Sequence, residues 1–190
     1  FSVFHRISPQ DYARNNKNIK LKIFFTGEDT TSQKSRGRGH DHYYLNFADI
    51  ALGFKYLDHP KYLRFPLWLT YINLEEFNMG KACLPFNKLL NYKPEKREEF
   101  CSILSNHDSN NTRTSIVKAL SHYKLVTKGG GIFSNNKSVL CNKMGVSAGE
   151  NNKLNFIKKY KFNICSESSI SNGYITEKIF ECLIAGCIPI

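Results

Sequence analysis

Short apolar runs, separated by polar and glycine-containing segments, predict strands in the first half of the chain. Residues 20–25 (KLKIFF) alternate between polar and apolar positions and then close on two aromatic residues, as a strand does. The run at 62–69 contains Pro66, which cannot donate a hydrogen bond to a neighbouring strand, so we expect a short or edge strand there. The other expected elements are a loop at 29–42, a strand at 49–54, and a helix with a linker over 74–98.

From residue 100 onward, strand-like runs alternate with helical patterns. Ile116, Val117 and Leu120 have the spacing of one helix face, and Gly186 ends the last helical pattern. Strands that alternate with helices predict an α/β fold with a parallel sheet covered on both faces, in which ligands bind at the carboxyl ends of the strands. The expected elements are strands at 100–104, 125–127, 162–165 and 187–190, and helices at 112–123, 150–160 and 175–185.

The composition agrees with a folded enzyme or binding module. The chain has 190 residues, of which 41% are hydrophobic and 13% aromatic, enough for a packed core. Its length predicts one domain, or one domain and part of a second. Apolar runs stay far below the roughly 20 residues that span a bilayer, and the first residues lack the pattern of a secretory signal. We therefore expect a water-soluble chain.

The net charge indicates which partners the chain could bind, and the cysteine pattern indicates the redox state of its thiols. The net charge of +11 favours an anionic partner, but the lysines are spread along the chain instead of clustering with aromatics, which argues against nucleic acid. The six cysteines form no C-x-x-C pair, and four lie in apolar runs, so we expect reduced, buried thiols. His40-Asp41-His42 has no second ligand pair of matching spacing, so we expect no metal site.

Two cations lie where helix electrostatics disfavour them. Arg113 falls at the start of one expected helix and Lys178 in the first turn of another, where the helix dipole is positive. A bound phosphate would reverse the sign of this effect, because amide donors and both side chains would then face an anion. The alternative is a solvated Arg113 and a Lys178 that pairs with Glu181 at i,i+3.

The residues around Lys178 suit a nucleotide. Glu177 can accept hydrogen bonds from ribose hydroxyls, Lys178 can neutralise a diphosphate, and Tyr174 can pack on a sugar or base. The alternatives are a core tyrosine and a Thr176 that only caps the helix. Glu28 follows the first strand and is placed to act as a general base, although a plain surface glutamate is the alternative reading.

As a set, these segments resemble the α-1,3/4-fucosyltransferases of glycosyltransferase family 10, and the bacterial, Helicobacter-type members above all. The resemblance covers residues 20–190. The family pattern reads roughly TGEN near the first strand and FEN, GYVTEKI and IPIYWG near the end. The matching segments here are Phe25-Thr-Gly-Glu28, Asn46 to Phe54, Tyr62 to Pro66, Ser105-Asn106 leading to Arg113, Val126 to Gly131, Cys165-Ser-Glu-Ser-Ser, Asn172-Gly-Tyr-Ile-Thr-Glu-Lys-Ile and Ala185 to Ile190.

The resemblance implies a GT-B fold, with two Rossmann-like domains facing a cleft. Residues 1–96 would form the acceptor-side domain and residues 97–190 the GDP-fucose-binding domain, both incomplete in what would be an interior fragment. By motif match, Glu28 would be the catalytic base. The donor site would use Arg113, Ser168, Tyr174, Glu177 and Lys178. No metal or other cofactor would be obligatory.

The implied reaction is inverting transfer of L-fucose from GDP-fucose to the 3-hydroxyl of N-acetylglucosamine in a lactosamine-type glycan, such as a Lewis-type glycan or an O-antigen. The alternatives are a glycosyltransferase with another GDP-sugar or acceptor, and a non-catalytic nucleotide-binding fragment. The chain departs from the family where Ser166-Glu167-Ser168 stands in place of FEN. The expected location is the bacterial cytoplasm or the inner face of the cytoplasmic membrane, with peripheral association to anionic lipid, or the Golgi membrane for a eukaryotic member.

Overall fold

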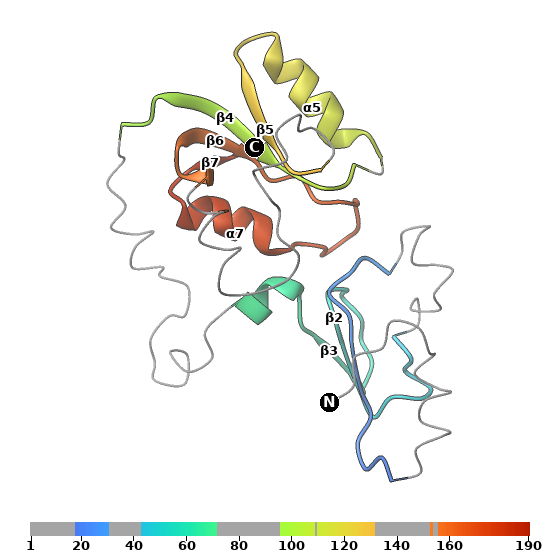
Figure 1. The fold of residues 1–190 in the computed structure, drawn as a ribbon. Helices are drawn as coiled ribbons and strands as arrows, with labels where there is room; N and C mark the ends of the chain where they lie inside the picture. The colour runs from blue at the N-terminus through green and yellow to red at the C-terminus, as the bar shows by residue number, and fades with distance from the viewer. Residues whose placement is uncertain (1–17, 31–42, 72–95, 109, 132–152, 154–155) are drawn as a thin grey trace. The chain divides into compact units, whose positions relative to one another are not determined.

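The computed structural model describes residues 18–30, 43–71, 96–108, 110–131, 153 and 156–190, and these form two compact units (Figure 1). Unit 1 comprises Phe1–Leu67 with Ser171–Gly173, and unit 2 comprises Trp68–Ile170 with Tyr174–Ile190. In chain order the elements are β1 (Ile23–Phe25), β2 (Ile50–Gly53), β3 (Tyr62–Arg64), the 3-10 helix η1 (Leu67–Tyr71), β4 (Glu99–Leu104), α5 (Thr112–Ser121), β5 (Val126–Gly129), β6 (Tyr160–Ile164), α7 (Glu177–Ile184) and β7 (Ile188–Pro189).

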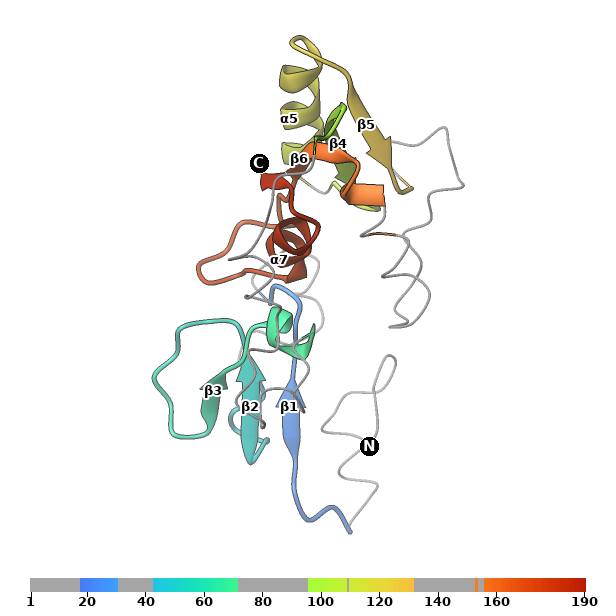
Figure 2. The ribbon, with the colours of Figure 1, turned by 90° about the vertical axis from the view of Figure 1, so that its left-hand side faces the viewer.

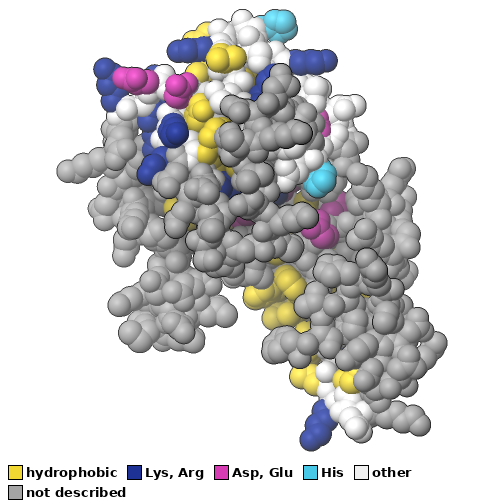
Figure 3. Space-filling view, viewed as in Figure 1, with side chains coloured by type: hydrophobic (Ala, Val, Ile, Leu, Met, Phe, Trp, Pro, Cys, Tyr) yellow, Lys and Arg dark blue, Asp and Glu magenta, His cyan; other side chains and the backbone are white. Residues whose placement is uncertain are grey.

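Unit 1 contains a parallel three-stranded sheet in the order β1-β2-β3. One face packs on buried aromatic side chains, with the ring of Tyr43 4.9 Å from that of Tyr62. The other face exposes apolar side chains, among them Ile23 and Leu63, and Figure 3 shows hydrophobic side chains at the surface along this unit. The strands predicted at 20–25 and 49–54 are thus confirmed, in shorter form.

The short or edge strand expected within 62–69 is confirmed. β3 ends at Arg64 and lies at an edge of the sheet, and the chain then turns into η1. Pro66 explains the break, because it lacks an N–H for a sheet ladder and its fixed φ suits a helical turn. The last backbone hydrogen bond between β2 and the chain after β3 runs from the Phe65 N–H to the Gly53 carbonyl, at 2.6 Å.

Unit 2 contains a parallel four-stranded sheet in the order β5-β4-β6-β7, and Figure 2 shows α5 and α7 beside it. The predicted alternation of strands and helices is confirmed here. Two apolar clusters hold the layers together: one around Ile103 and Val117, and one around Ile157 and Cys182. The central strands β4 and β6 also share a buried hydrogen bond from Ser102 Oγ to Asn163 Oδ1, 2.9 Å.

Arg97, just before β4, forms hydrogen bonds with residues near β6 and β7. Its guanidinium donates to the carbonyls of Tyr160 and Ala185 at 3.0 and 2.7 Å and to the sulfur of Cys187 at 2.9 Å. All four described cysteines are free thiols, and three are buried, as predicted. Burial raises the pKa of Cys101 to about 11, so this thiol stays protonated near neutral pH.

Several predictions fall outside the described residues: most of the loop at 29–42, residues 74–95 of the helix and linker, most of the helix at 150–160, and Cys83 and Cys141. In the part of the chain that is described, every helix is too short or too polar to cross a membrane.

Candidate functional site

Arg113 is buried at the start of α5, at 4% exposure, so the alternative of a solvated arginine is wrong. Its guanidinium donates to Ser105 Oγ at 2.6 Å and to the carbonyl of Ser166 at 2.9 and 3.2 Å, and it also contacts the His107 carbonyl. These partners lie in the loops that follow β4 and β6. Arg113 therefore has a fixed position at the carboxyl ends of the two central strands, where parallel sheets bind ligands.

Asp108 explains how a cation is tolerated in the first turn of α5. Its carboxylate accepts hydrogen bonds from the backbone N–H groups of Arg113 and Thr114, at 3.1 and 2.8 Å, and from the Thr114 hydroxyl at 2.5 Å. It thereby satisfies amides that Asn111, the residue before the helix, leaves without a side-chain cap. Partial burial raises the pKa of Asp108, but these hydrogen bonds outweigh it and hold the pKa below its ordinary value.

Replacing Asp108 by alanine is expected to speed hydrogen exchange of the first amides of α5 about fivefold at pH 7, since a lost cap costs roughly 1 kcal/mol. A carboxyl whose pKa is lowered by folding stabilises the fold above its unfolded value, about pH 4, and loses this effect as the pH falls through the folded value. The difference from wild type should thus shrink below pH 4, with the amides of α7 as the internal control. A difference that persists unchanged at pH 2 would contradict this role.

Lys178 stands in the first turn of α7, as predicted, but its partners differ from the expected one. Its ammonium donates to Glu167 Oε2 at 2.8 Å and to Thr176 Oγ1 at 2.6 Å, and it lies 3.6 Å from Glu177 Oε1. The alternative, a pair between Lys178 and Glu181, is wrong, because Glu181 instead forms an ion pair with Lys153. Glu167, the partner of Lys178, belongs to the loop before the helix. The spacing of residues along one helix does not reveal such a pair.

Glu167 organises the start of α7. Its Oε1 accepts hydrogen bonds from the Thr176 N–H at 2.7 Å and the Thr176 hydroxyl at 2.8 Å, while Oε2 holds Lys178. Thr176 is the N-cap residue, yet its side chain makes no capping bond to the helix. Thr176 therefore occupies the expected N-cap position but does not cap the helix with its side chain. Instead, its own N–H and hydroxyl donate hydrogen bonds to the carboxylate of Glu167.

Replacing Glu167 by alanine should lower the free energy of unfolding by about 3 kcal/mol, because the Lys178 ammonium and the Thr176 donors lose their acceptor in a half-buried setting. Urea unfolding of the full-length protein measures this change in the free energy of unfolding. Glu98→Ala is the matched control, since Glu98 is an exposed glutamate of the same unit. Equal unfolding curves for the two variants would contradict the role given to Glu167.

Five charged residues meet at α7, and we refer to them as the charge cluster: Lys153, Glu167, Glu177, Lys178 and Glu181. Burial alone would raise the pKa of Glu177, but the two lysines outweigh it and keep that pKa below its ordinary value. For Glu181 burial dominates and its pKa is raised, although Lys153 opposes this. Glu177 therefore stays an anionic acceptor near neutral pH.

The structure brings Arg113 and Lys178 to the same small cavity of about 10 Å³, the room of roughly one water molecule. Ser166 and Asn163 also line it. The Ser166 hydroxyl is buried and has no hydrogen-bond partner among the described residues. Lys153 and Glu181 line it as well, so three cationic side chains, one acidic side chain and an unused hydroxyl group meet there. The excess of positive charge suits an anionic oxygen.

The remaining predicted residues lie around this place or in the other unit. Tyr174 is buried at 7% exposure, which agrees with the core-tyrosine reading, and Ser168 lies half-buried in the loop between β6 and α7. Glu28 belongs to unit 1, where it is exposed three residues after β1, and its N–H donates to Thr26 Oγ1 at 3.2 Å.

Sequence reasoning gave no role to the residues that position the two cations, Ser105, Asp108 and Glu167, or to Lys153, which pairs with Glu177 and Glu181. Glu167 had a signal, because it is the middle residue of the segment that stands in place of the family's FEN and keeps the carboxylate there. Ser105 had one too, because it begins the segment Ser105-Asn106 that leads to Arg113 in the family pattern. Lys153 had none, since its partners Glu177 and Glu181 lie in a separate segment. In the described part of the chain, histidine, cysteine and acidic side chains do not gather into a group of three that suits a metal ion. His40-Asp41-His42 lies outside that part.

Solved structures share this fold. The chain aligns with a crystal structure of an α1,3-fucosyltransferase with GDP-fucose at a TM-score of 0.61 and 24% identity, over 92% of this chain and 53% of that one. Two further structures of α1,3-fucosyltransferase, one of them with GDP, align at TM-scores of 0.58 and 0.60, with 26% and 25% identity, over 88% of this chain and 49% and 51% of theirs. The predicted α/β fold of GT-B type is confirmed. The boundary between residues 96 and 97 stays a prediction.

Sequence comparisons identify the family. Residues 93–190 match the model of glycosyltransferase family 10 (fucosyltransferase), C-terminal part. An α-(1,3)-fucosyltransferase of Helicobacter pylori is 27% identical over 195 residues, which cover 89% of this chain and 36% of that protein. The chain therefore belongs to glycosyltransferase family 10. It spans about half the length of the solved structures and about a third of the Helicobacter pylori relative.

Proposed function

We propose that this chain is part of an α-1,3-fucosyltransferase that moves L-fucose from GDP-fucose to the 3-hydroxyl of N-acetylglucosamine in a lactosamine-type glycan. The observation that carries the proposal is the convergence of Arg113 and Lys178, each in the first turn of a helix, on one cavity at the strand ends. Family membership supports it, and so does the similarity to α1,3-fucosyltransferases solved with GDP-fucose and with GDP.

On the donor side, the two cations bind the diphosphate of GDP-fucose and stabilise the negative charge of GDP as it leaves. Glu167 and Thr176 accept hydrogen bonds from the Lys178 ammonium. A remaining N–H of this ammonium donates to a phosphate oxygen of the donor. Glu177, kept anionic by the lysines beside it, accepts hydrogen bonds from the ribose hydroxyls. Ser168 lines the donor site.

On the acceptor side, Glu28 is the general base. Its carboxylate takes the proton of the acceptor hydroxyl while that oxygen attacks C1 of fucose, and the bond between C1 and the diphosphate breaks as GDP departs. One displacement inverts the configuration at C1, through a transition state with oxocarbenium character. Because Arg113 and Lys178 supply the positive charge for the leaving group, the reaction needs no obligatory metal ion.

A donor series tests the proposal. The full-length protein is assayed with N-acetyllactosamine and equal concentrations of GDP-fucose, GDP-mannose and UDP-galactose, with and without EDTA. The proposal expects transfer from GDP-fucose alone and the same rate in EDTA. Transfer from GDP-mannose would point instead to a glycosyltransferase with another GDP-sugar. Binding of GDP without transfer from any donor would point to a non-catalytic nucleotide-binding protein.

A further inference from the structure

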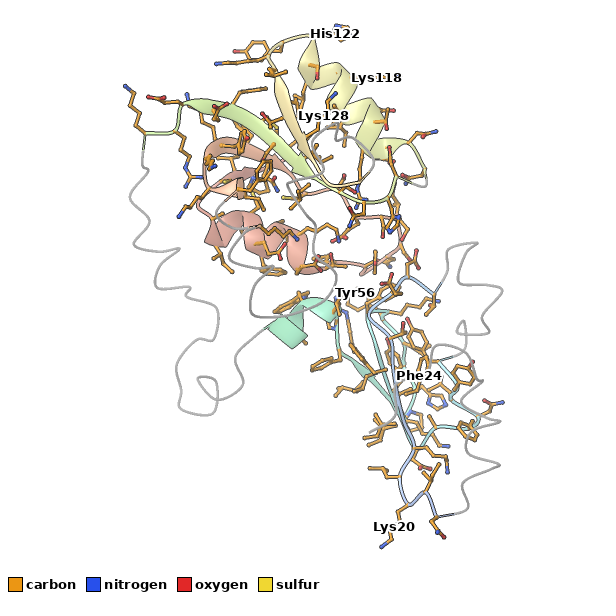
Figure 4. The ribbon with its side chains drawn as sticks, viewed as in Figure 1. Lys20, Phe24, Tyr56, Lys118, His122 and Lys128 are labelled. Atoms are coloured by element: carbon orange, nitrogen blue, oxygen red, sulfur yellow. The ribbon has the colours of Figure 1, made fainter. Side chains whose placement is uncertain are left out.

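Tyr56 is a large exposed aromatic residue at the edge of the unit 1 sheet where ligands bind in parallel sheets. It follows β2 and is 68% exposed. Because the three strands are parallel, their carboxyl ends share this edge, so Glu28 after β1 and Arg64 at the end of β3 lie at it too. Figure 4 shows Tyr56 at the opposite end of the unit from Lys20.

The Tyr56 ring is held in place although it is exposed. The guanidinium carbon of Arg64 lies 4.3 Å from the ring centre, a cation–π contact that covers one face. Arg64 is fixed in turn, since its Nε donates to the carbonyl of Phe54 at 3.1 Å. The hydroxyl of Tyr62 braces the same loop through the Lys55 carbonyl, also at 3.1 Å. The platform is thus ordered before any ligand arrives, which reduces the entropy lost on binding.

Gly173 approaches the edge of the Tyr56 ring. It has φ +81°, and a Cβ there would lie 2.9 Å from Cε2 of Tyr56 and 3.0 Å from the Phe54 carbonyl oxygen. Glycine is therefore required both by the backbone conformation and by the space.

We propose that Tyr56 and Arg64 form an acceptor platform, on which a pyranose ring of the glycan stacks its apolar C–H face against Tyr56 and directs hydroxyl groups to the Arg64 guanidinium. The inference rests on the proposed function, because it is the base at Glu28 that requires an acceptor sugar at this edge. A neutral, hydroxyl-rich ring suits this pair, since it offers both an apolar face and hydrogen-bond acceptors.

The test compares Tyr56→Ala, Tyr56→Phe and wild type in the full-length protein. Binding of N-acetyllactosamine is measured by saturation-transfer NMR, and KM is measured separately for acceptor and donor. Tyr56→Ala should weaken acceptor binding and raise the acceptor KM about five- to tenfold, with the KM for GDP-fucose unchanged. Tyr56→Phe keeps the ring and should match wild type. Tyr123→Ala removes a tyrosine of unit 2 that is 80% exposed and serves as the matched control.

Two failures can be told apart. Acceptor binding that is equal in wild type and Tyr56→Ala overturns the platform, whether or not fucose is transferred, and so does an equal rise of both KM values. Acceptor binding that depends on Tyr56, in a protein that transfers no fucose, supports the platform and overturns the proposed fucosyltransferase function.

Discussion

Replacing Glu28 by glutamine is expected to lower kcat for fucose transfer by roughly 100- to 10,000-fold while the affinity for GDP-fucose stays unchanged, since a general base contributes about this much. The amide keeps the size of the side chain but cannot take the proton of the acceptor hydroxyl. β1 ends three residues before Glu28, at the edge formed by the carboxyl ends of the strands, where parallel sheets bind ligands, and the Glu28 side chain is exposed. Timed transfer assays with labelled GDP-fucose measure kcat, and calorimetry measures the affinity for GDP-fucose.

The control for this variant is Glu98→Gln, an exposed glutamate in unit 2, which should transfer fucose like wild type. Unchanged turnover in Glu28→Gln would show that another group takes the proton.

Replacing Lys178 by alanine is expected to weaken GDP-fucose binding and to lower kcat/KM by roughly 100- to 1,000-fold, as loss of one electrostatic contact to a leaving group does. Both effects follow because the ammonium meets the diphosphate before and during its departure. The change also leaves Glu167 and Glu177 without their shared cation. Lys178→Arg keeps the positive charge and should retain part of the activity, which separates loss of charge from loss of fold.

The matched control is Lys118→Ala. Lys118 is an exposed lysine on α5 in the same unit, and Figure 4 shows it on the outer side of the helix. It carries the same charge but lines no part of the cavity of Arg113 and Lys178. If Lys118→Ala weakens GDP-fucose binding as much as Lys178→Ala does, the effect reflects net charge and the assignment of Lys178 is wrong.

The secondary structure of unit 2 could be predicted because its signals are local. Apolar runs of strand length and the spacing of Ile116, Val117 and Leu120 depend only on neighbours in sequence. Gly186, with φ 69°, follows α7 as predicted, since glycine takes a left-handed conformation without strain. The 3-10 helix η1 was missed because the apolar residues after Pro66 are equally typical of a strand.

The positions of Arg113 and Lys178 were predictable, but their partners were not. Helix starts can be read from sequence, and a cation there is unusual enough to notice. The acceptors of Arg113 come from the loops after β4 and β6, and Glu167 lies eleven residues before Lys178. Such pairs depend on the order of the strands in the sheet. The spacing of residues along the chain carries no information about that order. The resemblance to the family pointed to the segment of Glu167 without giving that residue a role.

The most direct test of the central claim is transfer of labelled fucose from GDP-fucose to N-acetyllactosamine by the full-length protein, with the linkage of the product mapped by NMR. The account predicts a product with α-linked fucose on the 3-hydroxyl of N-acetylglucosamine, and no product with the Glu28→Gln variant. Fucose on another hydroxyl would contradict the proposed acceptor position. No fucosylated product from a folded protein that binds GDP-fucose would contradict the proposed reaction itself.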